Sequence, residues 1–557
     1  MLPYDLLFII SEYANFIPVN KRLHRYKLDN YFYKLKEKYS CEFYKKNIKL
    51  DAKHISLNIY ELPDITDVSS LGHVKELTLC RCSYLEDISP LSKVEKITLD
   101  CCDSVTDIYA LRNREKLRLL HCRGIVDVSM LGNIRELDLA GCINITDVSA
   151  LGNVKKLNLA GCDKITDVSA LGNIEHLILS GCYRIEDVSA LGNVEYLCLC
   201  NCYFVTDVSA LGNVKELDLS RCEDITDVSA LGNVETLNLY KCRGVRDVSC
   251  LGNVKNLSLS KSYISDVSAL GNVKKLDLSC CEYIEDVSAL GNVEWLNLSC
   301  CENLEDVSAL GNVKILYLGG CKNIKDVSAL GNVEQLNISW CKKITDVSAL
   351  GNVKELNLAG CKITDISNLK NVNKIILSEC KNIKDFTVLE NVKEAEIKYN
   401  DNVIDSVVFR NLERLDIFCC RGITDVSYMG NIKKLYIFCC ENITEVAALR
   451  NIKDLSLSTC HGITDVSALG NVERLNLHSC DNITDVSALG NVKYLNLSFC
   501  KNITDVSALG SVKELDLSYC KNITDVSALG RVRKLTLYGC KNLKGLSELG
   551  NVGVLNL

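Results

Sequence analysis

Several features that mark other classes of protein are scarce in this sequence of 557 residues. Only 4 residues are proline, so long proline-rich linkers, which remain disordered, are excluded. No run of about 18 apolar residues occurs, so no transmembrane helix is predicted. The 64 Lys and Arg face 71 Asp and Glu, so the basic excess of a dedicated nucleic-acid binder is missing. We expect a folded chain that binds neither membrane nor nucleic acid.

The first residues, MLPYDLLFIISEYANFIPVNKR, include an apolar stretch but lack the basic start of a secretory signal. Asp5 and Glu12 flank or interrupt that stretch. We therefore expect an intracellular protein, in the cytoplasm. In such a reducing compartment the 32 cysteines are expected to be free thiols.

A 20-residue repeat takes up most of the chain. The pattern L-G-N-V-K-x-L-x-L-x-x-C-x-x-I-T-D-V-S-A recurs from Leu71 to Leu549, and its first position can be followed through 25 units. Phe409 and Met429 replace the leucine in two of them. Two spacings shrink to 19, over residues 251–270 and 350–369, each by losing one residue just after the cysteine. Repeats of this length indicate a solenoid.

Within each unit the L-x-L stretch predicts a short β-strand. In Leu137-Asp138-Leu139 apolar and polar residues alternate with period two, which is typical of a strand with one buried face. Strands that recur in one direction every 20 residues can stack only as a parallel ladder. The remaining residues of each unit must then cross back on the opposite, convex side.

An earlier half-unit, HISLNIY, places Leu57 and Ile59 in register with Leu77 and Leu79. We therefore expect the solenoid, of about 25 units of 20 residues, to occupy residues 51–557.

The segment I-T-D-V-S-A-L has room for about one tight helical turn, so full convex helices are not expected. Its Asp, as at Asp147, Asp167 and Asp227, is suited to cap that turn through a side-chain oxygen. Because this residue recurs in nearly every unit, we interpret it as structural and not as a catalytic carboxylate.

These features resemble the leucine-rich-repeat family, whose signature is L-x-x-L-x-L-x-x-N/C-x-L. Ile134, Leu137, Leu139 and Cys142 match its first four positions, and Ile145 comes one place later than the family's next leucine. The resemblance covers about nine tenths of the chain. It implies an α/β solenoid, a horseshoe or superhelix with a parallel concave sheet, short convex turns and a protein partner on the concave face.

The repeated cysteine fills 22 of 24 corresponding positions, and Ser262 and Asn400 take the other two. The family resemblance implies that Asn or Cys at this corner forms hydrogen bonds to neighbouring backbone. A buried thiol is a small hydrophobe with a weak donor. We therefore predict a ladder of structural thiols and no disulfides.

Other cysteines raise the question of a metal site. They include the adjacent pairs Cys101-Cys102, Cys280-Cys281, Cys300-Cys301, Cys419-Cys420 and Cys439-Cys440. In the run Cys198-Leu-Cys200-Asn-Cys202, strand geometry places the first two on the concave side and the third in the core, so a tetrahedral set is not evident. The seven His are scattered, and no catalytic signature occurs. We predict no metal, no cofactor, no catalytic residues and no enzyme activity.

Residues 1–50 break the period and predict a small N-terminal helical cap, since Leu6, Leu7, Ile10 and Tyr13 follow Pro3 at helical spacing. The stretch resembles the opening of an F-box, and Val19-Asn20-Lys21-Arg22 resembles its later V-C-K-R stretch, with Asn in place of the usual Cys. The structural alternative is a plain hydrophobic cap on the solenoid end. The F-box resemblance implies that a Skp-type linker of a cullin ubiquitin ligase contacts Leu2, Pro3, Leu6, Leu7 and Ile10.

Three functions remain open: a substrate-recognition adaptor of a ubiquitin ligase, a generic intracellular scaffold without a ligase link, and an internalin-like adhesin. The adhesin rests on the likeness of I-T-D-V-S-A-L to the internalin convex segment. Uniform repeats behind such an N-terminus also resemble proteins of giant DNA viruses of amoebae, which implies the cytoplasm of an infected host cell.

Outward positions of the strands and their exits are the candidate partner-binding residues. In early units they are small or polar, as at Asp138 and Ala140, whereas aromatics become frequent from about residue 295. The candidates are Trp295, Tyr317, Trp340, Phe418, Tyr436, Phe438, Tyr494, Phe499 and Tyr519. Exposed aromatics are enriched at interface hot spots. The alternative is that they stack on one another as cross-strand neighbours and stiffen the sheet.

Overall fold

The computed structural model describes residues 32–35, 56–60, 65–72, 74–402 and 406–556. They fall into two compact units, with unit 1 ending at Asn297 and unit 2 beginning at Leu298. The F-box-like residues Leu2, Pro3, Leu6, Leu7 and Ile10 lie outside the described residues. The first strand, β1 (Phe32–Leu35), falls within the segment expected to be a helical cap and pairs in parallel with β2.

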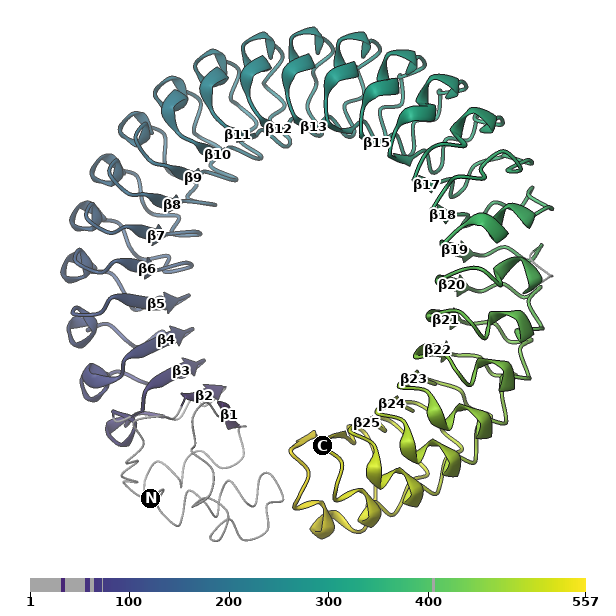
Figure 1. The fold of residues 1–557 in the computed structure, drawn as a ribbon. Coiled ribbons are helices and arrows are strands. Elements are labelled where there is room, and N and C mark those ends of the chain that lie inside the picture. The colour runs from purple at the N-terminus through teal and green to yellow at the C-terminus, as the bar shows by residue number, and fades with distance from the viewer. Residues whose placement is uncertain (1–31, 36–55, 61–64, 73, 403–405, 557) are drawn as a thin grey trace. The chain divides into compact units, whose positions relative to one another are not determined.

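Unit 1 is a parallel ladder in which each strand pairs with the next along the chain (Figure 1). After β1 its strands are β2 (Ser56–Tyr60), β3 (Glu76–Cys80), β4 (Lys96–Asp100), β5 (Lys116–Leu120), β6 (Glu136–Asp138), β7 (Lys156–Asn158), β8 (His176–Ile178), β9 (Tyr196–Cys198), β10 (Glu216–Asp218), β11 (Thr236–Asn238), β12 (Asn256–Ser258), β13 (Lys275–Asp277) and β14 (Trp295–Asn297).

Short 3-10 helices form the opposite side of unit 1. They are η3 (Ser69–Leu71), η4 (Ser89–Lys93), η5 (Tyr109–Leu111), η6 (Ser129–Leu131), η7 (Ser149–Leu151), η8 (Ser169–Leu171), η9 (Ser189–Leu191), η10 (Ser209–Asn213), η11 (Ser229–Asn233), η12 (Ser249–Asn253), η13 (Ser268–Asn272) and η14 (Ser288–Asn292). We call the two sides the sheet side and the turn side.

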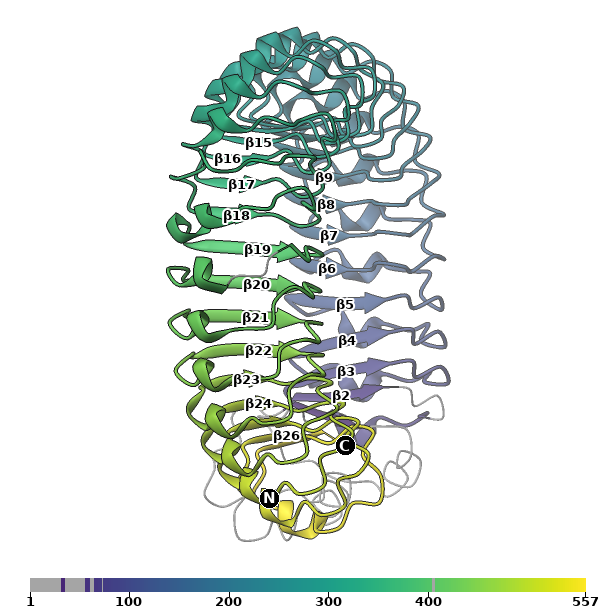
Figure 2. The ribbon, with the colours of Figure 1, turned by 90° about the vertical axis from the view of Figure 1, so that its right-hand side faces the viewer.

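Unit 2 repeats this arrangement, and Figure 2 shows its strands as a stack of parallel arrows. The strands are β15 (Ile315–Tyr317), β16 (Gln335–Asn337), β17 (Glu355–Asn357), β18 (Lys374–Ile376), β19 (Glu394–Lys398), β20 (Arg414–Phe418), β21 (Lys434–Phe438), β22 (Asp454–Ser458), β23 (Arg474–Asn476), β24 (Tyr494–Asn496), β25 (Glu514–Asp516), β26 (Lys534–Thr536) and β27 (Val554–Asn556).

The turn side of unit 2 again consists of 3-10 helices. They are η15 (Ser308–Asn312), η16 (Ser328–Asn332), η17 (Ser348–Leu350), η18 (Thr387–Asn391), η19 (Ser406–Phe409), η20 (Ser427–Met429), η21 (Ala447–Leu449), η22 (Ser467–Asn471), η23 (Ser487–Asn491), η24 (Ser507–Ser511), η25 (Ser527–Leu529) and η26 (Leu546–Leu549). One tight turn per repeat on this side confirms the sequence prediction. Among the described residues, no helix has the length and hydropathy of a membrane span.

The ladder keeps the register that the sequence predicts. Leu57 pairs with Leu77 and Ile59 with Leu79. The first 19-residue spacing leaves the register intact, because Leu257 still faces its counterpart in β13. The missing residue is taken from the turn after the strand, so a shorter repeat does not move the buried face.

Each repeat buries the same apolar positions. In one repeat of unit 1 the side chains are at most 2% exposed, and these residues are Leu137, Leu139, Cys142, Ile145, Val148, Leu151 and Val154. The period-two pattern of the strand and the apolar positions of the turn side therefore meet in one continuous core within each unit. Leu-to-Ala changes in such a core leave a cavity.

The repeated Asp and Gly have separate structural tasks on the turn side. Asp147 Oδ1 accepts a hydrogen bond of 2.9 Å from the backbone N–H of Ser149, the first residue of η7. The same bond recurs at Asp167 and elsewhere, which supports the structural interpretation of this Asp. Gly152 packs so tightly that a Cβ there would lie 2.5 Å from the carbonyl oxygen of Ala170 in the next repeat.

The thiol ladder is present and uses a repeated acceptor. The Cys162 thiol donates to the carbonyl of Leu139, 23 residues earlier, at 3.3 Å. Ser262 makes the corresponding bond to Leu239 at 3.4 Å. Asn400 differs, since its Nδ2 donates to the carbonyl of Cys380 at 3.1 Å. Each cysteine in the described part of the chain is a free thiol.

Strand length varies between repeats, and in two of them it differs together with the bonds of one outward residue; β8, with Ile178 at that position, is also three residues long. In β7 the Asn158 Oδ1 accepts the backbone N–H of Ala160 at 3.0 Å, and the strand stops after three residues. Asp416 occupies the equivalent position in β20, but both its oxygens accept hydrogen bonds from Arg414, at 3.3 and 2.9 Å. The strand there continues to Phe418. An Asp or Asn that bonds its own backbone therefore competes with the ladder.

Candidate functional site

The nine predicted partner-binding aromatics all lie on the sheet side, at strand positions or strand exits that face away from the core. Trp295 is in β14 of unit 1, and the other eight are in unit 2. None is buried. The structure brings four of them into two clusters, and it places the other five apart from these ring stacks.

The first cluster, which we call the Phe418 cluster, consists of Tyr399, Phe418 and Phe438. Phe418 and Phe438 are register partners in β20 and β21. Their rings stack with centroids 4.6 Å apart and an angle of 9° between the planes. Tyr399 meets Phe418 edge-on at 5.2 Å. Cross-strand stacking, the alternative raised from the sequence, is therefore present here.

The second cluster, the Tyr519 cluster, consists of His478, Phe499, Tyr519 and Tyr538. Phe499 stacks on Tyr519 at 4.5 Å. His478 meets Phe499 edge-on at 5.2 Å, and Tyr538 meets Tyr519 edge-on at 5.4 Å. Tyr538 remains 56% exposed, so this cluster continues to the solvent.

Trp340 stands at the exit of β16, with a φ of 62°. Many repeats use this left-handed corner, so the conformation belongs to the repeat and directs the side chain outward. The indole lies over Gly360, where a Cβ would come within 2.6 Å of the ring. The residue is 45% exposed.

Polar partners hold the remaining tyrosines of unit 2. The Tyr436 hydroxyl donates to Asp454 Oδ2 at 2.7 Å. Burial and this bond raise the pKa of Tyr436 to about 12. The guanidinium of Arg474 lies 3.9 Å from the ring centroid of Tyr494, close enough for a cation–π contact.

Tyr399, His478 and Tyr538 were missed by the sequence analysis although they belong to the two clusters. The signal that could have found them is the ladder between neighbouring repeats, in which the Tyr399 N–H donates to the Phe418 carbonyl and the Tyr519 N–H to the Tyr538 carbonyl. The sequence of one strand alone does not reveal neighbours that lie in the next repeat.

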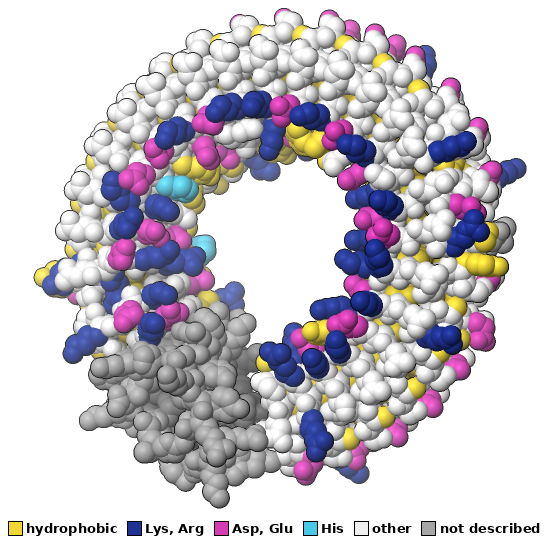
Figure 3. Space-filling view, viewed as in Figure 1, with side chains coloured by type: hydrophobic (Ala, Val, Ile, Leu, Met, Phe, Trp, Pro, Cys, Tyr) yellow, Lys and Arg dark blue, Asp and Glu magenta, His cyan; other side chains and the backbone are white. Residues whose placement is uncertain are grey.

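Charges on the sheet side of unit 1 are largely paired across repeats, and Figure 3 shows both signs interspersed there. Typical pairs, each with a nitrogen–oxygen distance of 2.7 Å, are Lys155–Glu175, Lys215–Glu195 and Lys255–Glu235. Solvent screens exposed pairs of this kind, so they contribute little to stability.

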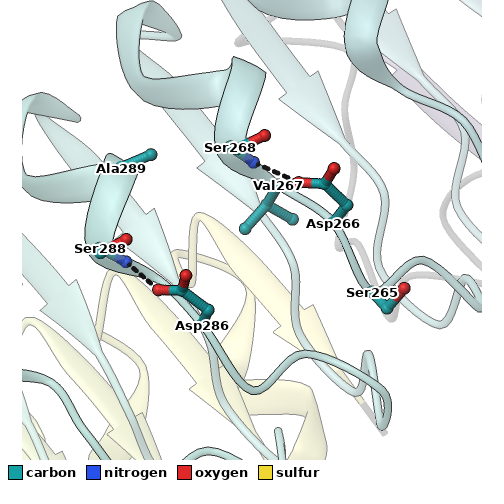
Figure 4. A pocket seen from close by; sticks show the side chains of 7 residues that line it. All are labelled: Ser265, Asp266, Val267, Ser268, Asp286, Ser288 and Ala289. Atoms are coloured by element: carbon teal, nitrogen blue, oxygen red, sulfur yellow. Dashed lines mark hydrogen bonds between the residues drawn. The ribbon is translucent and has the colours of Figure 1, made fainter.

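A shallow pocket on the turn side of unit 1 is lined by carboxylates that already accept hydrogen bonds from the backbone. Asp266 and Asp286 line it, but their carboxylates accept the backbone N–H groups of Ser268 and Ser288, at 2.9 and 2.8 Å (Figure 4). The pocket is therefore the space between two repeated turns.

Within the described residues, one set of side chains has the donor atoms and spacing for a metal ion. The ligand atoms of Asp100, Cys101 and His121 lie within 4.8 Å of one another. The run from Cys198 to Cys202 behaves as the sequence predicts, because the last thiol is buried in the core.

Three stretches, residues 352–366, 491–510 and 511–529, match the family model described as Leucine Rich repeat. A comparison with curated proteins finds no significant match.

Solved structures that resemble the chain include the following three. The functional domain of InlJ from Listeria monocytogenes, which includes a cysteine ladder, is 18% identical; the match covers 70% of this chain and 68% of that one, with a TM-score of 0.30. The TLR13–ssRNA13 complex is 17% identical, with 87% and 81% covered and a TM-score of 0.49. The LRR ectodomain of the Arabidopsis thaliana receptor kinase GASSHO1/SCHENGEN3, in complex with CASPARIAN STRIP INTEGRITY FACTOR 2, is 13% identical, with 84% and 85% covered and a TM-score of 0.33.

The 20-residue period, the parallel ladders, the buried Leu and Cys positions and the three matched stretches lead to one conclusion. The chain carries leucine-rich repeats, and its fold is a leucine-rich-repeat solenoid.

Proposed function

We propose that the chain is a binding scaffold that holds a protein partner against the sheet side of unit 2. The observation that carries the proposal is the set of aromatic side chains that the core does not need. Trp340 and Phe499 are 45% and 38% exposed, while the repeats beneath them are fully packed. Large exposed aromatics are unfavourable in water and dominate interface hot spots. Trp295 of unit 1 is kept as a separate candidate.

A protein suits this surface better than other ligands. Flat ring stacks beside charged groups such as Arg414 and Asp416 provide apolar anchors with a polar rim. The chain carries a net charge of −7, which disfavours a phosphate backbone. In this proposal the protein acts by binding and not by catalysis.

The test is proximity labelling in cells with the full chain and with a variant carrying Trp340→Ala and Phe418→Ala. We expect the variant to lose a specific set of labelled proteins, because truncating a hot-spot aromatic removes about 2 kcal/mol or more of binding. Tyr428→Ala is the matched control, since Tyr428 is 51% exposed but lies in η20 on the turn side. Equal labelling by all three proteins would refute the proposed surface.

The role of substrate adaptor in a ubiquitin ligase is a narrower form of this proposal. It rests on the F-box resemblance of the N-terminal residues, and the alternative is a scaffold with no ligase link. A pulldown with a purified Skp-type linker separates them. The adaptor should retain the linker through Leu2, Pro3, Leu6, Leu7 and Ile10, and deletion of residues 1–50 should abolish retention while leaving the aromatic surface intact.

A further inference from the structure

Four side chains with metal-binding chemistry meet on the sheet side of unit 1. They come from three successive repeats: Cys80 from the end of β3, Asp100 and Cys101 from the end of β4, and His121 from the exit of β5. Cys80 and Asp100 are register partners in the ladder. The next position along each repeat is the left-handed corner, where Cys101 and His121 have φ values of 53° and 51°.

The Asp100 carboxylate is the centre of the group. Its Oδ1 lies 3.0 Å from His121 Nδ1 and 3.4 Å from the Cys101 sulfur. Its Oδ2 lies 3.6 Å from the Cys80 sulfur. A tetrahedral zinc ion with Zn–S of about 2.3 Å and Zn–N and Zn–O of about 2.0–2.1 Å separates its ligand atoms by roughly 3.3–3.8 Å. The three spacings measured from Asp100 differ from these by at most a few tenths of an ångström. The ligand atoms of Asp100, Cys101 and His121 lie within 4.8 Å of one another, and Cys80 joins them through Asp100 Oδ2.

The structure also accounts for the direction of the His121 ring. The neighbour at the same corner in the next repeat is Gly141, and a Cβ there would lie 2.3 Å from His121 Cδ2. The His121 ring therefore occupies the space that the side chain of any residue other than glycine at position 141 would fill. Its Nδ1 points back to the Asp100 carboxylate, so the donor atoms converge.

We propose that Asp100, Cys101 and His121, with Cys80 as fourth ligand, form a zinc-binding site that ties the ends of β3, β4 and β5 together. Thiolate, imidazole and carboxylate are the donors that Zn²⁺ takes in proteins, whereas Mg²⁺ and Ca²⁺ take oxygen donors. Each thiol that binds the ion releases its proton to solvent. The site lies on the protein surface, as the 60% exposure of the His121 side chain shows, so zinc can enter without opening the core.

This proposal departs from the prediction of no metal, which considered cysteines close together in sequence. The four ligands span 42 residues, from Cys80 to His121. Only the 20-residue register brings them side by side.

The test uses the full chain, reduced and freed of metal with a chelator, and titrates it with Co²⁺ alone. We expect one Co²⁺ per chain with a thiolate-to-cobalt charge-transfer band and the strong visible bands of tetrahedral Co²⁺. His121→Ala and Cys101→Ser should each lose these signals. Cys250→Ser is the matched control, because Cys250 is a partly buried thiol on the turn side that donates to the Val228 carbonyl, and it should bind as the wild type does.

A second measurement separates loss of the site from loss of the fold. Zinc should raise the melting temperature of the wild type and of Cys250→Ser but not that of His121→Ala, while Mg²⁺ should change none of them. A wild-type chain that binds no Co²⁺ at micromolar concentration would overturn the proposal. Tetrahedral spectra and a zinc-dependent shift that persist in His121→Ala and Cys101→Ser would overturn it as well.

Discussion

The repeats of β6 to β12 in unit 1 and those of β19 to β22 in unit 2 share one core and differ on the sheet side. Leu137 and Leu435 are equally buried, and both regions have the same turn-side geometry. On the sheet side, however, β6 and β7 end after three residues, whereas β19 to β22 have five. The longer strands β20 and β21 carry the stacked Phe418 and Phe438, and in the first region His176 and Tyr196 stack across the short strands β8 and β9. The comparison shows that the buried positions determine the structure of each repeat, whereas the outward residues differ between repeats without changing it.

A core deletion should have the largest effect, and the same effect in both regions. Leu137→Ala and Leu435→Ala each leave a cavity at a site that is at most 2% exposed, so each should lower the free energy of unfolding by about 2–5 kcal/mol. Urea denaturation of the full chain measures this. Lys156→Ala, at an exposed position of β7, is the control and should change stability by at most about 0.5 kcal/mol. A large effect in only one region would show that the two cores are not equivalent.

Substitutions at the repeated Cys or Asn position of the thiol ladder should lower the free energy of unfolding by smaller amounts, which differ between the regions. Asn400 donates to the Cys380 carbonyl and accepts the backbone N–H of Asn402 at 3.1 Å. Asn400→Ala removes the partner of the Asn402 N–H, while the Cys380 carbonyl keeps the N–H of Ile383 at 3.3 Å. The change should cost about 1–3 kcal/mol. Cys162→Ala removes only a weak thiol donor and should cost less. Equal losses in urea denaturation would mean that the two corners are held in the same way.

Strand length should be exchangeable between the regions at little cost. Arg414→Met frees the Asp416 carboxylate, which should then accept the Phe418 N–H and end β20 after three residues. The reciprocal change, Asp138→Thr, removes the bond from the Ala140 N–H to Asp138 Oδ1 and makes that N–H available to the ladder. We expect stability to change by about 0.5 kcal/mol or less. Backbone chemical shifts by NMR provide the readout, and a five-residue β20 in Arg414→Met would contradict the proposed competition.

Acid should lower the stability of both regions by similar amounts, and the change per residue should be smaller than for the substitutions above. Hydrogen bonds from the side chain and backbone N–H of Ser149 lower the pKa of Asp147 in unit 1, and Ser427 does the same for Asp425 in unit 2. A carboxyl with a lowered folded-state pKa adds stability above its unfolded pKa of about 3.9, and this contribution is lost as pH falls through the folded pKa. Urea midpoints across this acidic range measure it. Asp147→Asn and Asp425→Asn should reduce the pH dependence by similar amounts.

The aromatic candidates show how far outward residues can be read from sequence. The outward direction of six of them follows from period two within a strand. Trp340, Phe499 and Tyr519 instead stand at the left-handed corner after a strand, and the backbone there turns them outward. Which of them touch could not be read from any one strand. Phe418 and Phe438 stack because they are register partners, while Tyr494 instead meets a guanidinium.

The sequence by itself determined the repeat, the parallel ladder, the buried positions and the thiol ladder, because burial of one face every 20 residues allows a single arrangement of each unit. The tertiary structure alone decided which outward side chains become neighbours. Cys80, Asp100, Cys101 and His121 meet because the ladder aligns three repeats and the left-handed corner turns two of these side chains toward one carboxylate. Such contacts join residues of different repeats, so they depend on the register of the ladder and the geometry of the corner. The sequence of a single repeat does not determine them.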